Sequence, residues 1–540
     1  MDVTPARQPC ASTTVDHCEY RVDARKIMFL LALMLVPALF ETTGAQSATS
    51  VNDSYARYCA KCHGADRLGG MGPALIPQNL TRIKKDQARR AIAQGLPATQ
   101  MPGLGHVLGD DEIDALVEHI YTPLPEMPGW GLKEISGSQI VYKAAPQQVN
   151  APIYDADPLN LFVVVEAGDH HVTVLDGDRF EPIYRFKSRY ALHGGPKFSP
   201  TGRFVYFASR DGWITKFDLF GLNRVAEIRA GINTRNLAVS SDGRFVIVAN
   251  YLPHTLVILN AHDLTPKKVI PVVDEHGTSS RVSAVYDAPP RQSFIAALKD
   301  LTEVWEIPYH DNPQFYGIVH DYRYEGPPKV SESFPIRRIR LDDYLDDFFF
   351  DQAYEHVVGA ARNAKQGQVV NLIVGRKIAD VDLPGLPHLG SGVTWTYQGR
   401  PVLATPNLKK GLISVIDMNS WQTIRQIETL GPGFFMRTHE NTRYAWVDVF
   451  FGPDRDAVHV IDKDTLELVR SLRPAPGKTA AHVEFTRDGR FALLSVWDMD
   501  GAVVVYDAET LAEVKRIPMK KPSGKYNVYN KITRSAGTSH

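Results

Sequence analysis

Cysteine is scarce in this chain, and its scarcity excludes several ways of stabilising a protein. The 540 residues contain only four cysteines: Cys10, Cys18, Cys59 and Cys62. The first two lie in a stretch that we expect to be removed, so the mature chain would keep two thiols with two residues between them. No disulfide is expected, and a zinc site built on this pair would lack its other cysteine ligands.

The chain also has almost no net charge and has no membrane-length apolar run. Its 60 basic and 61 acidic residues give a formal net charge of −1, which offers no reason to expect nucleic acid or an anionic membrane as partner. The apolar run 28–40 follows a basic pair and has the length of a signal-peptide core, short of the roughly 20 residues that span a bilayer. We therefore predict a leader with signal peptide over 1–48, no stable membrane span afterwards, and a periplasmic protein.

The two remaining cysteines belong to the sequence Cys59-Ala60-Lys61-Cys62-His63. Cys-x-x-Cys-His is the attachment pattern of c-type heme. On one helical turn the two thiols reach the two vinyl groups of the porphyrin, and the histidine lies under the ring, where it binds iron. The sequence therefore predicts one covalent heme c, held by Cys59 and Cys62, with His63 as an iron ligand.

The sixth iron ligand should come from a downstream loop that covers the other heme face. Met101, which precedes a proline, is the preferred candidate, and Met71 is the alternative, closer to the attachment helix. After this loop, residues 110–120 have the apolar spacing and acidic start of a capped amphipathic helix. Together these features predict an all-α cytochrome c domain over 50–122, resembling that family.

Prolines break the helical pattern after this domain and predict a linker over 123–150. From 151 to 540 short β-rich runs alternate with turn clusters. A Gly-Arg-Phe turn recurs around Arg203, Arg244 and Arg490, and the first two lie 41 positions apart, close to the length of a four-stranded propeller blade. About 380 residues at this period give seven to nine blades, so the second domain is predicted to be an all-β propeller.

The propeller region contains short motifs in a fixed order. They include Tyr190-Ala191-Leu192-His193, Ser209-Arg210-Asp211-Gly212, Gly231-Ile232-Asn233-Thr234-Arg235, Arg437-Thr438-His439 and Pro522-Ser523-Gly524-Lys525-Tyr526. In this order, and from about 50 to 532, the chain resembles the heme c/heme d1 nitrite reductase superfamily. The resemblance implies an eight-bladed propeller that binds heme d1, with His193 as the proximal iron ligand. Arg210 and Arg235 are candidates to pair with the carboxylates of the tetrapyrrole.

One segment separates the branches of that superfamily. Nitrite reductases have two distal histidines, the first in a Phe-x-His-Asp-Gly-Gly segment, whereas residues 347–352 here contain neither the histidine nor the glycine pair. His356 is near in sequence, but its surroundings do not match. The second histidine is retained in a different setting as His388, and His482 is an additional candidate over the macrocycle. This pattern resembles the dihydro-heme d1 dehydrogenase branch, the NirN-type proteins.

That branch oxidises one propionate side chain of dihydro-heme d1 to acrylate, the last step of heme d1 assembly. The resemblance implies His388 as the distal group and His482 as the base, and it leaves an exchange of these two roles open. Heme c would take the electrons and pass them to a periplasmic acceptor; nitrite reductase apoprotein or other heme d1 assembly proteins are the expected partners. A respiratory nitrite reductase and a non-catalytic heme d1 carrier remain the alternatives.

Overall fold

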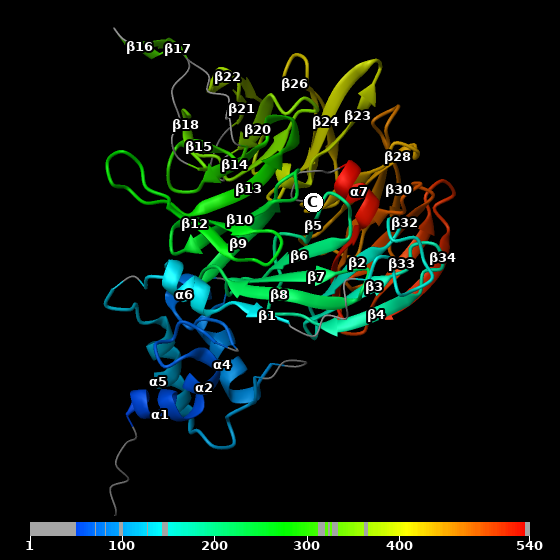
Figure 1. The fold of residues 1–540 in the computed structure, drawn as a ribbon. Helices are drawn as coiled ribbons and strands as arrows, with labels where there is room; N and C mark the ends of the chain where they lie inside the picture. The colour runs from blue at the N-terminus through cyan, green and yellow to red at the C-terminus, as the bar shows by residue number, and fades with distance from the viewer. Residues whose placement is uncertain are drawn as a thin grey trace, which may run out of the picture. The chain divides into compact units, whose positions relative to one another are not determined.

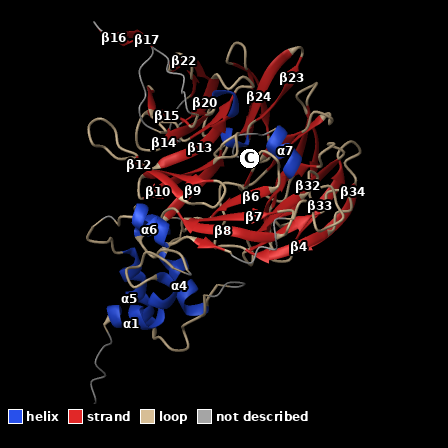
Figure 2. Cartoon of the chain, viewed as in Figure 1, coloured by secondary structure: helices blue, strands red, loops and turns tan. Residues whose placement is uncertain are grey.

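The computed structural model of the chain describes residues 50–70, 72–81, 83–96, 101–126, 128–142, 149–310, 319–321, 324–326, 333–360 and 366–534. The leader expected over 1–48 lies outside these ranges. Most helices belong to the N-terminal part and the strands to the remainder, as the blue and red elements of Figure 2 show. Among the described residues, no helix has the length and apolar character needed to cross a membrane.

The helices before the propeller are short, and several begin at residues suited to capping. They are α1 Val51–Tyr58, α2 Ala60–His63, α3 Pro77–Leu80, α4 Lys85–Gln94, α5 Asp110–Tyr121 and α6 Leu132–Gly137. The side chain of Ser50 accepts a hydrogen bond from the Asp53 N–H and starts α1. Three acidic residues lie in the first turn of α5, where their negative charge interacts favourably with the helix dipole.

The first five helices enclose a small hydrophobic core of their own. Its centre comprises Tyr55, Cys59 and Leu80 together with the apolar face of α5, namely Ile113, Leu116, Val117 and Ile120. The spacing of these α5 residues buries one face of the helix, as the sequence pattern predicted. Burying apolar faces against one another is what stabilises helices this short.

The segment predicted as a linker, 123–150, has more structure than its prolines suggested. It contains α6 and the short strand β1 Ile140–Val141, which adds to the edge of the second blade by pairing with β8. Ile135 of α6 is completely buried in a propeller core. The indole of Trp130 donates to the Arg229 carbonyl at 2.9 Å. These contacts hold the segment against the propeller, because they bury apolar side chains of residues that were predicted from the prolines to form a linker.

From β2 onward the described residues form eight β-sheet blades, which confirms the eight-bladed propeller implied by the family resemblance (Figure 1). Strands β16 Val319–Asp321 and β17 Tyr324–Gly326 form a separate two-stranded ribbon. The strands of the first four blades are β35 Pro522–Asn527, β2 Phe162–Glu166, β3 His171–Leu175 and β4 Pro182–Lys187; β5 Lys197–Phe198, β6 Phe204–Ala208, β7 Trp213–Asp218 and β8 Asn223–Arg229; β9 Asn233–Val239, β10 Phe245–Leu252, β11 Thr255–Asn260 and β12 Pro266–Pro271; and β13 Val282–Ala288, β14 Ser293–Leu298, β15 Glu303–Pro308 and β18 Arg337–Arg340. The strands of the last four are β19 Asp347–Phe350, β20 His356–Ala360, β21 Gly367–Asn371 and β22 Arg376–Val381; β23 Val393–Tyr397, β24 Arg400–Pro406, β25 Leu412–Asp417 and β26 Gln422–Glu428; β27 Met436–Thr438, β28 Tyr444–Asp448, β29 Val458–Asp462 and β30 Leu468–Leu472; and β31 Ala480–Phe485, β32 Phe491–Val496, β33 Gly501–Asp507 and β34 Glu513–Met519.

The ring is closed by the C-terminal strand. β35 pairs antiparallel with β2, so the last strand of the chain completes the first blade. The first strands of successive blades contact one another, including β9 with β13, β27 with β31 and β31 with β35. The last helix, α7 Val528–Thr533, contacts both β5 and β35 and therefore spans the point of closure. Closure joins both ends of the propeller segment in one blade.

The Gly-Arg-Phe repeat is a turn between the first two strands of a blade. In each of three blades the glycine has a positive φ: 75° at Gly202, 72° at Gly243 and 76° at Gly489. A hydroxyl three residues before each glycine accepts the N–H of the following phenylalanine, as Ser199 does from Phe204 at 3.0 Å. The repeat is therefore structural, because only glycine adopts this backbone conformation without strain.

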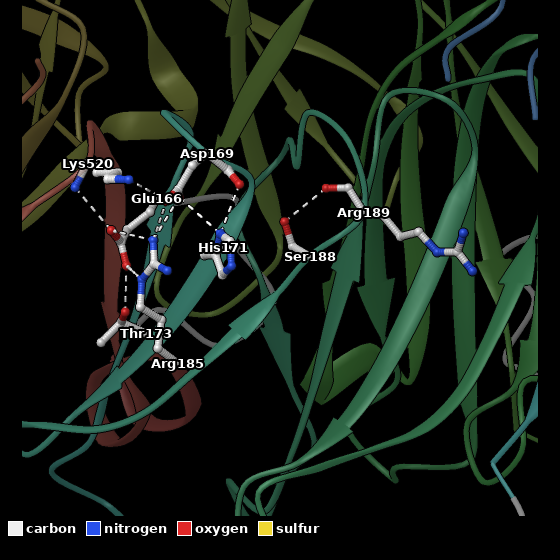
Figure 3. Close-up of polar contacts among 8 residues, drawn as sticks. All are labelled: Glu166, Asp169, His171, Thr173, Arg185, Ser188, Arg189 and Lys520. Atoms are coloured by element: carbon white, nitrogen blue, oxygen red, sulfur yellow. Dashed lines mark hydrogen bonds and ion pairs between the residues drawn. The ribbon is translucent and has the colours of Figure 1, made fainter. Parts of the chain in front are cut away.

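Charged side chains also tie the edges of the first blade together. Arg185 donates to Glu166 at 2.9 Å and to both oxygens of Asp169, while Thr173 donates to Glu166 at 2.6 Å (Figure 3). The Lys520 backbone N–H adds a further bond to Glu166. The two carboxylates are nearly buried, with side-chain exposures of 3% and 8%, so they depend on these donors.

Candidate active site

Cys59, Cys62 and His63 are arranged as a heme c attachment site requires. The His63 N–H donates to the Cys59 carbonyl at 2.9 Å, so the motif occupies one helical turn. The two cysteines are not joined in a disulfide. His63 Nδ1 donates to the Pro73 carbonyl at 2.8 Å, which leaves Nε2 as the nitrogen with a lone pair. Burial lowers the pKa of His63 and keeps the imidazole neutral, the form that binds a metal.

Gly72 lies directly against the His63 ring. A Cβ atom at this position would come within 2.7 Å of Cε1 of the imidazole, so no larger residue fits without moving the histidine. Met101 packs against the hydrophobic cluster that includes Cys59, in keeping with a place near the heme. Met71, the alternative ligand, lies outside the described residues. The choice of Met101 stays a prediction.

His193 is held by a backbone contact with β6 and side-chain contacts with β9. Its backbone N–H donates to the Ala208 carbonyl at 2.9 Å, and its Nδ1 donates to the Arg235 carbonyl at 2.7 Å. Nε2 is therefore the unprotonated nitrogen. One Arg235 guanidinium nitrogen lies 2.9 Å from Nε2 and 3.2 Å from Nδ1, so it sits over the ring face rather than in the ring plane, where a metal ion would bind. The tautomer is the one that the predicted proximal ligand needs.

The two predicted carboxylate-binding arginines are placed differently. Arg235 also donates from Nε to the Ser283 carbonyl at 3.0 Å, so its guanidinium is engaged by the protein. Arg210 lies near Tyr190: burial raises the pKa of the tyrosine, and the positive charge of Arg210 partly opposes that rise. Nothing in the structure tests either arginine against a tetrapyrrole carboxylate, and both assignments stay predictions.

His388 precedes the short helix η2 Leu389–Ser391 and faces the same region. Its Nδ1 donates to the Phe434 carbonyl at 2.6 Å, and Nε2 lies 3.8 Å from Asp347. Burial lowers the pKa of His388 although the Asp347 charge opposes this, and the charges of Arg235 and Arg437 lower it further. Since Arg235 touches His193 and acts on His388, the structure brings the two predicted histidines to one place.

His482 lies at a bulge in β31 and has an unusual environment. Its backbone is left-handed, with φ of 56°, and the register of β31 against β32 shifts around it. The ring is buried between Phe435 and Tyr526, with ring centres 4.7 Å and 5.0 Å away. Neither ring nitrogen has a hydrogen-bond partner among the described residues. An unpartnered buried imidazole is uncommon and indicates a ligand.

The electrostatic surroundings keep His482 neutral. Burial is the main reason that its pKa lies well below the usual value, and the charges of Lys525, Arg437 and Lys531 lower it further. The Lys525 ammonium donates to the backbone carbonyl of His482 and to Ser495 Oγ, the latter at 2.9 Å. His482 is thus neutral at pH 7, the state in which an imidazole can accept a proton.

Asp448 links the surroundings of His388 and His482 and was missed in the sequence. One carboxylate oxygen accepts from the N–H groups of Phe434 at 2.7 Å and Phe435 at 3.0 Å, and the other from the His482 N–H at 3.1 Å. The Phe434 carbonyl in turn holds His388. Burial raises the pKa of Asp448 to about 6, although the three N–H donors oppose that rise. A sequence pattern does not reveal this role, because the contacts link three separate blade segments.

Asp347 was also missed, although it opens the segment that distinguishes the branches. Its carboxylate accepts from the Gly390 N–H at 2.7 Å and from the Tyr286 hydroxyl at 2.7 Å. It therefore supports the loop that carries His388. His356, the nearby histidine, has both ring nitrogens occupied by Asp351 at 2.7 Å and Asn371 at 2.9 Å. Its role is structural.

Comparisons with known proteins agree with this geometry. The cytochrome d1 heme domain family matches residues 156–531, and the family of the cbb3-type cytochrome c oxidase subunit III matches 46–120. A dihydro-heme d1 dehydrogenase of Pseudomonas aeruginosa is 56% identical over 486 residues, covering 90% of this chain and 95% of that protein. A nitrite reductase of Stutzerimonas stutzeri is 24% identical over 554 residues, covering 93% of this chain and 96% of that protein.

A solved structure resembles the whole described fold. It is the dihydro-heme d1 dehydrogenase NirN in complex with DHE, with a TM-score of 0.84 and 55% identity, covering 89% of this chain and 100% of that one. The architecture and the matched domains thus define an oxidoreductase class, in which a cytochrome c domain precedes a heme d1-type propeller. Within that class the chain belongs to the dihydro-heme d1 dehydrogenase branch, which confirms the resemblance inferred from its motifs.

Proposed function

We propose that this protein oxidises a propionate side chain of dihydro-heme d1 to acrylate and so completes heme d1. The single observation that carries the reaction is His482, a buried neutral imidazole whose two nitrogens have no partner. The 56% identity to a dihydro-heme d1 dehydrogenase supports the substrate. Burying an imidazole without a hydrogen bond is unfavourable, so its presence here supports a role of His482 toward the bound tetrapyrrole.

The overall change removes two hydrogens from a –CH2–CH2– unit, releasing two protons and two electrons. When bound, heme c supplies a one-electron acceptor and the tetrapyrrole iron a second redox centre next to the reacting side chain. His482 accepts one proton, and the other leaves to solvent. His193 holds the proximal face, and His388, braced by Phe434 and Asp347, lies on the distal side. The electrons leave one at a time to a periplasmic acceptor.

The nitrite reductase alternative lacks support in residues 347–352. Conversion of nitrite to nitric oxide consumes two protons, and the segment contributes no second histidine to deliver them. Its first residue, Asp347, is instead engaged with Gly390 and Tyr286. We propose accordingly that the protein works in the periplasm alongside nitrite reductase apoprotein or other heme d1 assembly proteins.

Anaerobic incubation of the heme c-loaded protein with dihydro-heme d1 tests the proposal. The expected product has two hydrogens fewer by mass spectrometry, and the heme c absorbance should shift to the reduced form. Nitrite should yield little nitric oxide. His276→Ala serves as control, because His276 is a highly exposed histidine that should leave the rate unchanged. Rapid nitrite reduction with an untouched propionate would overturn the proposal, and tight binding with neither reaction would favour a carrier.

A further inference from the structure

Four buried cations gather near His482: Lys525, Arg437 and Lys531 act on its charge, and Lys197 acts on Lys531. They are Lys197 on β5, Arg437 on β27, Lys525 on β35 and Lys531 on α7, which we call the basic cluster. Each has a relative exposure of 8% or less. Their positive charges act on one another: Lys197 and Arg437 both act on Lys531, and Arg437 acts on Lys197 and Lys525. Four separate elements thus bring their cations to one buried place.

The negative charge beside the basic cluster does not match it. Glu484 and Asp448 are the carboxylates that act on these cations. Glu484 lies 3.7 Å from Arg437 Nε and also accepts from the Phe485 N–H at 3.0 Å. The Asp448 carboxylate already accepts hydrogen bonds from three backbone N–H groups. Fully ionised, the group would hold four positive charges against two negative ones, and burial strongly disfavours such an excess.

Two of the cations have atoms with no partner. Lys531 Nζ and Arg437 NH2 are buried and make no hydrogen bond among the described residues. The ring nitrogens of His482, which the charges of both residues reach, are likewise unpartnered. Buried polar atoms of native proteins are nearly always hydrogen-bonded, so several unpartnered donors beside one another indicate a missing acceptor. Because the donors are cationic, the acceptor should be an anion.

We propose that Lys531 and Arg437 bind the carboxylate of the side chain that is oxidised, and so hold its methylene groups at His482. This inference rests on the proposed function, which supplies the side chain. In a propionate the carboxylate lies within two bonds of both carbons that lose hydrogen. A cation pair next to the base is therefore placed to bind the carboxylate while the base faces the methylenes. The cluster selects the side chain that reacts by its position next to His482, since its cationic donors need an anion.

The groups facing Lys531 define how binding changes its charge. Lys197 on β5 and Arg437 on β27 are its positive neighbours. Glu484 on β31 is its negative neighbour, and His482 also lies on β31. Burial is the main reason that the pKa of Lys531 lies well below its usual value, and Lys197 lowers it further. A bound carboxylate would favour the ammonium form, so binding should take up protons at neutral pH.

Lys531→Met separates a ligand-binding lysine from a structural one. The substitution removes a buried cation that has no partner, so the free protein should keep or raise its melting temperature. Affinity for dihydro-heme d1, measured by anaerobic absorbance titration of the heme c-loaded full chain, should fall about 10- to 100-fold, the effect of one charged hydrogen bond. Arg437→Met should weaken binding similarly, and Arg437→Lys should restore part of it.

Lys216→Met provides the matched control. Lys216 is also buried, but its ammonium has a partner, the His262 carbonyl at 2.8 Å, and lies over the Phe204 ring. This variant should lower the melting temperature and leave tetrapyrrole affinity unchanged. A drop in the melting temperature of Lys531→Met, together with unchanged affinity, would overturn the proposal.

The source of the carboxylate is tested with the methyl ester of the tetrapyrrole. Wild type should bind the free acid more tightly than the ester, and Lys531→Met should show a smaller difference, because Arg437 still binds the carboxylate. Equal binding by wild type, combined with stabilisation by chloride or phosphate that Lys531→Met loses, would assign the cluster to a free anion and overturn the proposal. Because these readouts are affinities and melting temperatures, they stand even if no propionate is oxidised, which would contradict only the proposed function.

Discussion

His482→Asn should abolish most of the side-chain oxidation while leaving the protein folded. A neutral amide has no basic nitrogen, and loss of a general base typically slows a reaction about 10²- to 10⁴-fold. Binding of dihydro-heme d1 should change little, because His193 remains in its ligand tautomer. Single-turnover oxidation under anaerobic conditions, followed by reduction of heme c, measures the rate directly.

The cost in stability can be worked out from the contacts of His482. Its ring makes no hydrogen bond, so only its packing against Phe435 and Tyr526 is lost, about 1–3 kcal/mol for a partly filled cavity. Asparagine tolerates the left-handed backbone at this position, where φ is 56°. His482→Ala should cost about 1 kcal/mol more, because alanine is disfavoured there. Urea unfolding of both variants measures the difference.

The pH dependence follows from the direction of the His482 shift. Burial, aided by the Lys525 charge, holds the pKa of this histidine well below that of the unfolded chain. The unfolded state therefore binds the proton first, and the stability that neutral His482 contributes is present above about pH 6.5 and lost as pH falls toward its folded pKa. Between pH 7 and 5 the free energy of unfolding of wild type should therefore fall more than that of His482→Asn.

Two results would refute this reasoning about His482. A wild-type rate retained by His482→Asn would show that another group takes the proton, with His388 the first candidate. The second is a kcat/KM that falls steeply between pH 8 and 6.5. Such a fall would show that the base of the free enzyme has an ordinary histidine pKa, which the burial of His482 does not allow.

Further predictions concern heme c and the first blade. Cys59→Ser with Cys62→Ser should give protein without covalent heme, since residues 49–540 contain no other cysteine; a heme-stained band on a denaturing gel would contradict this. Met101→Ala should keep the covalent heme but lower its reduction potential and open a coordination site, and an unchanged potential and low-spin spectrum would shift the assignment to another ligand. Arg185→Met should destabilise the fold by about 2–3 kcal/mol in urea unfolding at pH 7, less than for a fully buried pair because the arginine side chain is 39% exposed. Burial alone would raise the pKa of Asp169, but its bonds to Arg185 hold that pKa below the usual value. The stability that the pair contributes is therefore lost as pH falls through the pKa of Asp169. The difference in unfolding free energy between wild type and Arg185→Met should accordingly become smaller below about pH 4.

Much of the architecture could be predicted because it depends on local patterns. The heme motif occupies one helical turn, and the spacing of apolar residues in 110–120 defines α5. The Gly-Arg-Phe repeat marks a turn that only a few residue types can form. The number of blades needed the family resemblance, since irregular periods left seven to nine open. The structure within 123–150 could not be foreseen, because its helix is stabilised by burial of Ile135 in the propeller rather than by its own propensity.

The histidines of the site could be named from motifs, but their supports could not. Asp448 contacts Phe434, Phe435 and His482, which lie up to 48 positions apart. These hydrogen bonds can form only when two neighbouring blades lie side by side. Lys531 looks like an ordinary charged residue of the C-terminal helix. Only closure of the ring by β35 and α7 buries it against Lys197. Burial, not sequence position, gives these residues their chemistry.

The same burial explains why the site should be selective for oxidation of a side chain over reduction of nitrite. Nitrite reduction needs groups that donate protons at neutral pH, and His388 and His482 both have pKa values lowered chiefly by burial. Neutral imidazoles are suited to accept protons instead. Dehydrogenation releases protons and therefore uses these histidines in the state that the protein already stabilises. Replacing Asp347, whose charge opposes the pKa shift of His388, with asparagine should lower that pKa further, and nitrite reduction should remain slow in this variant.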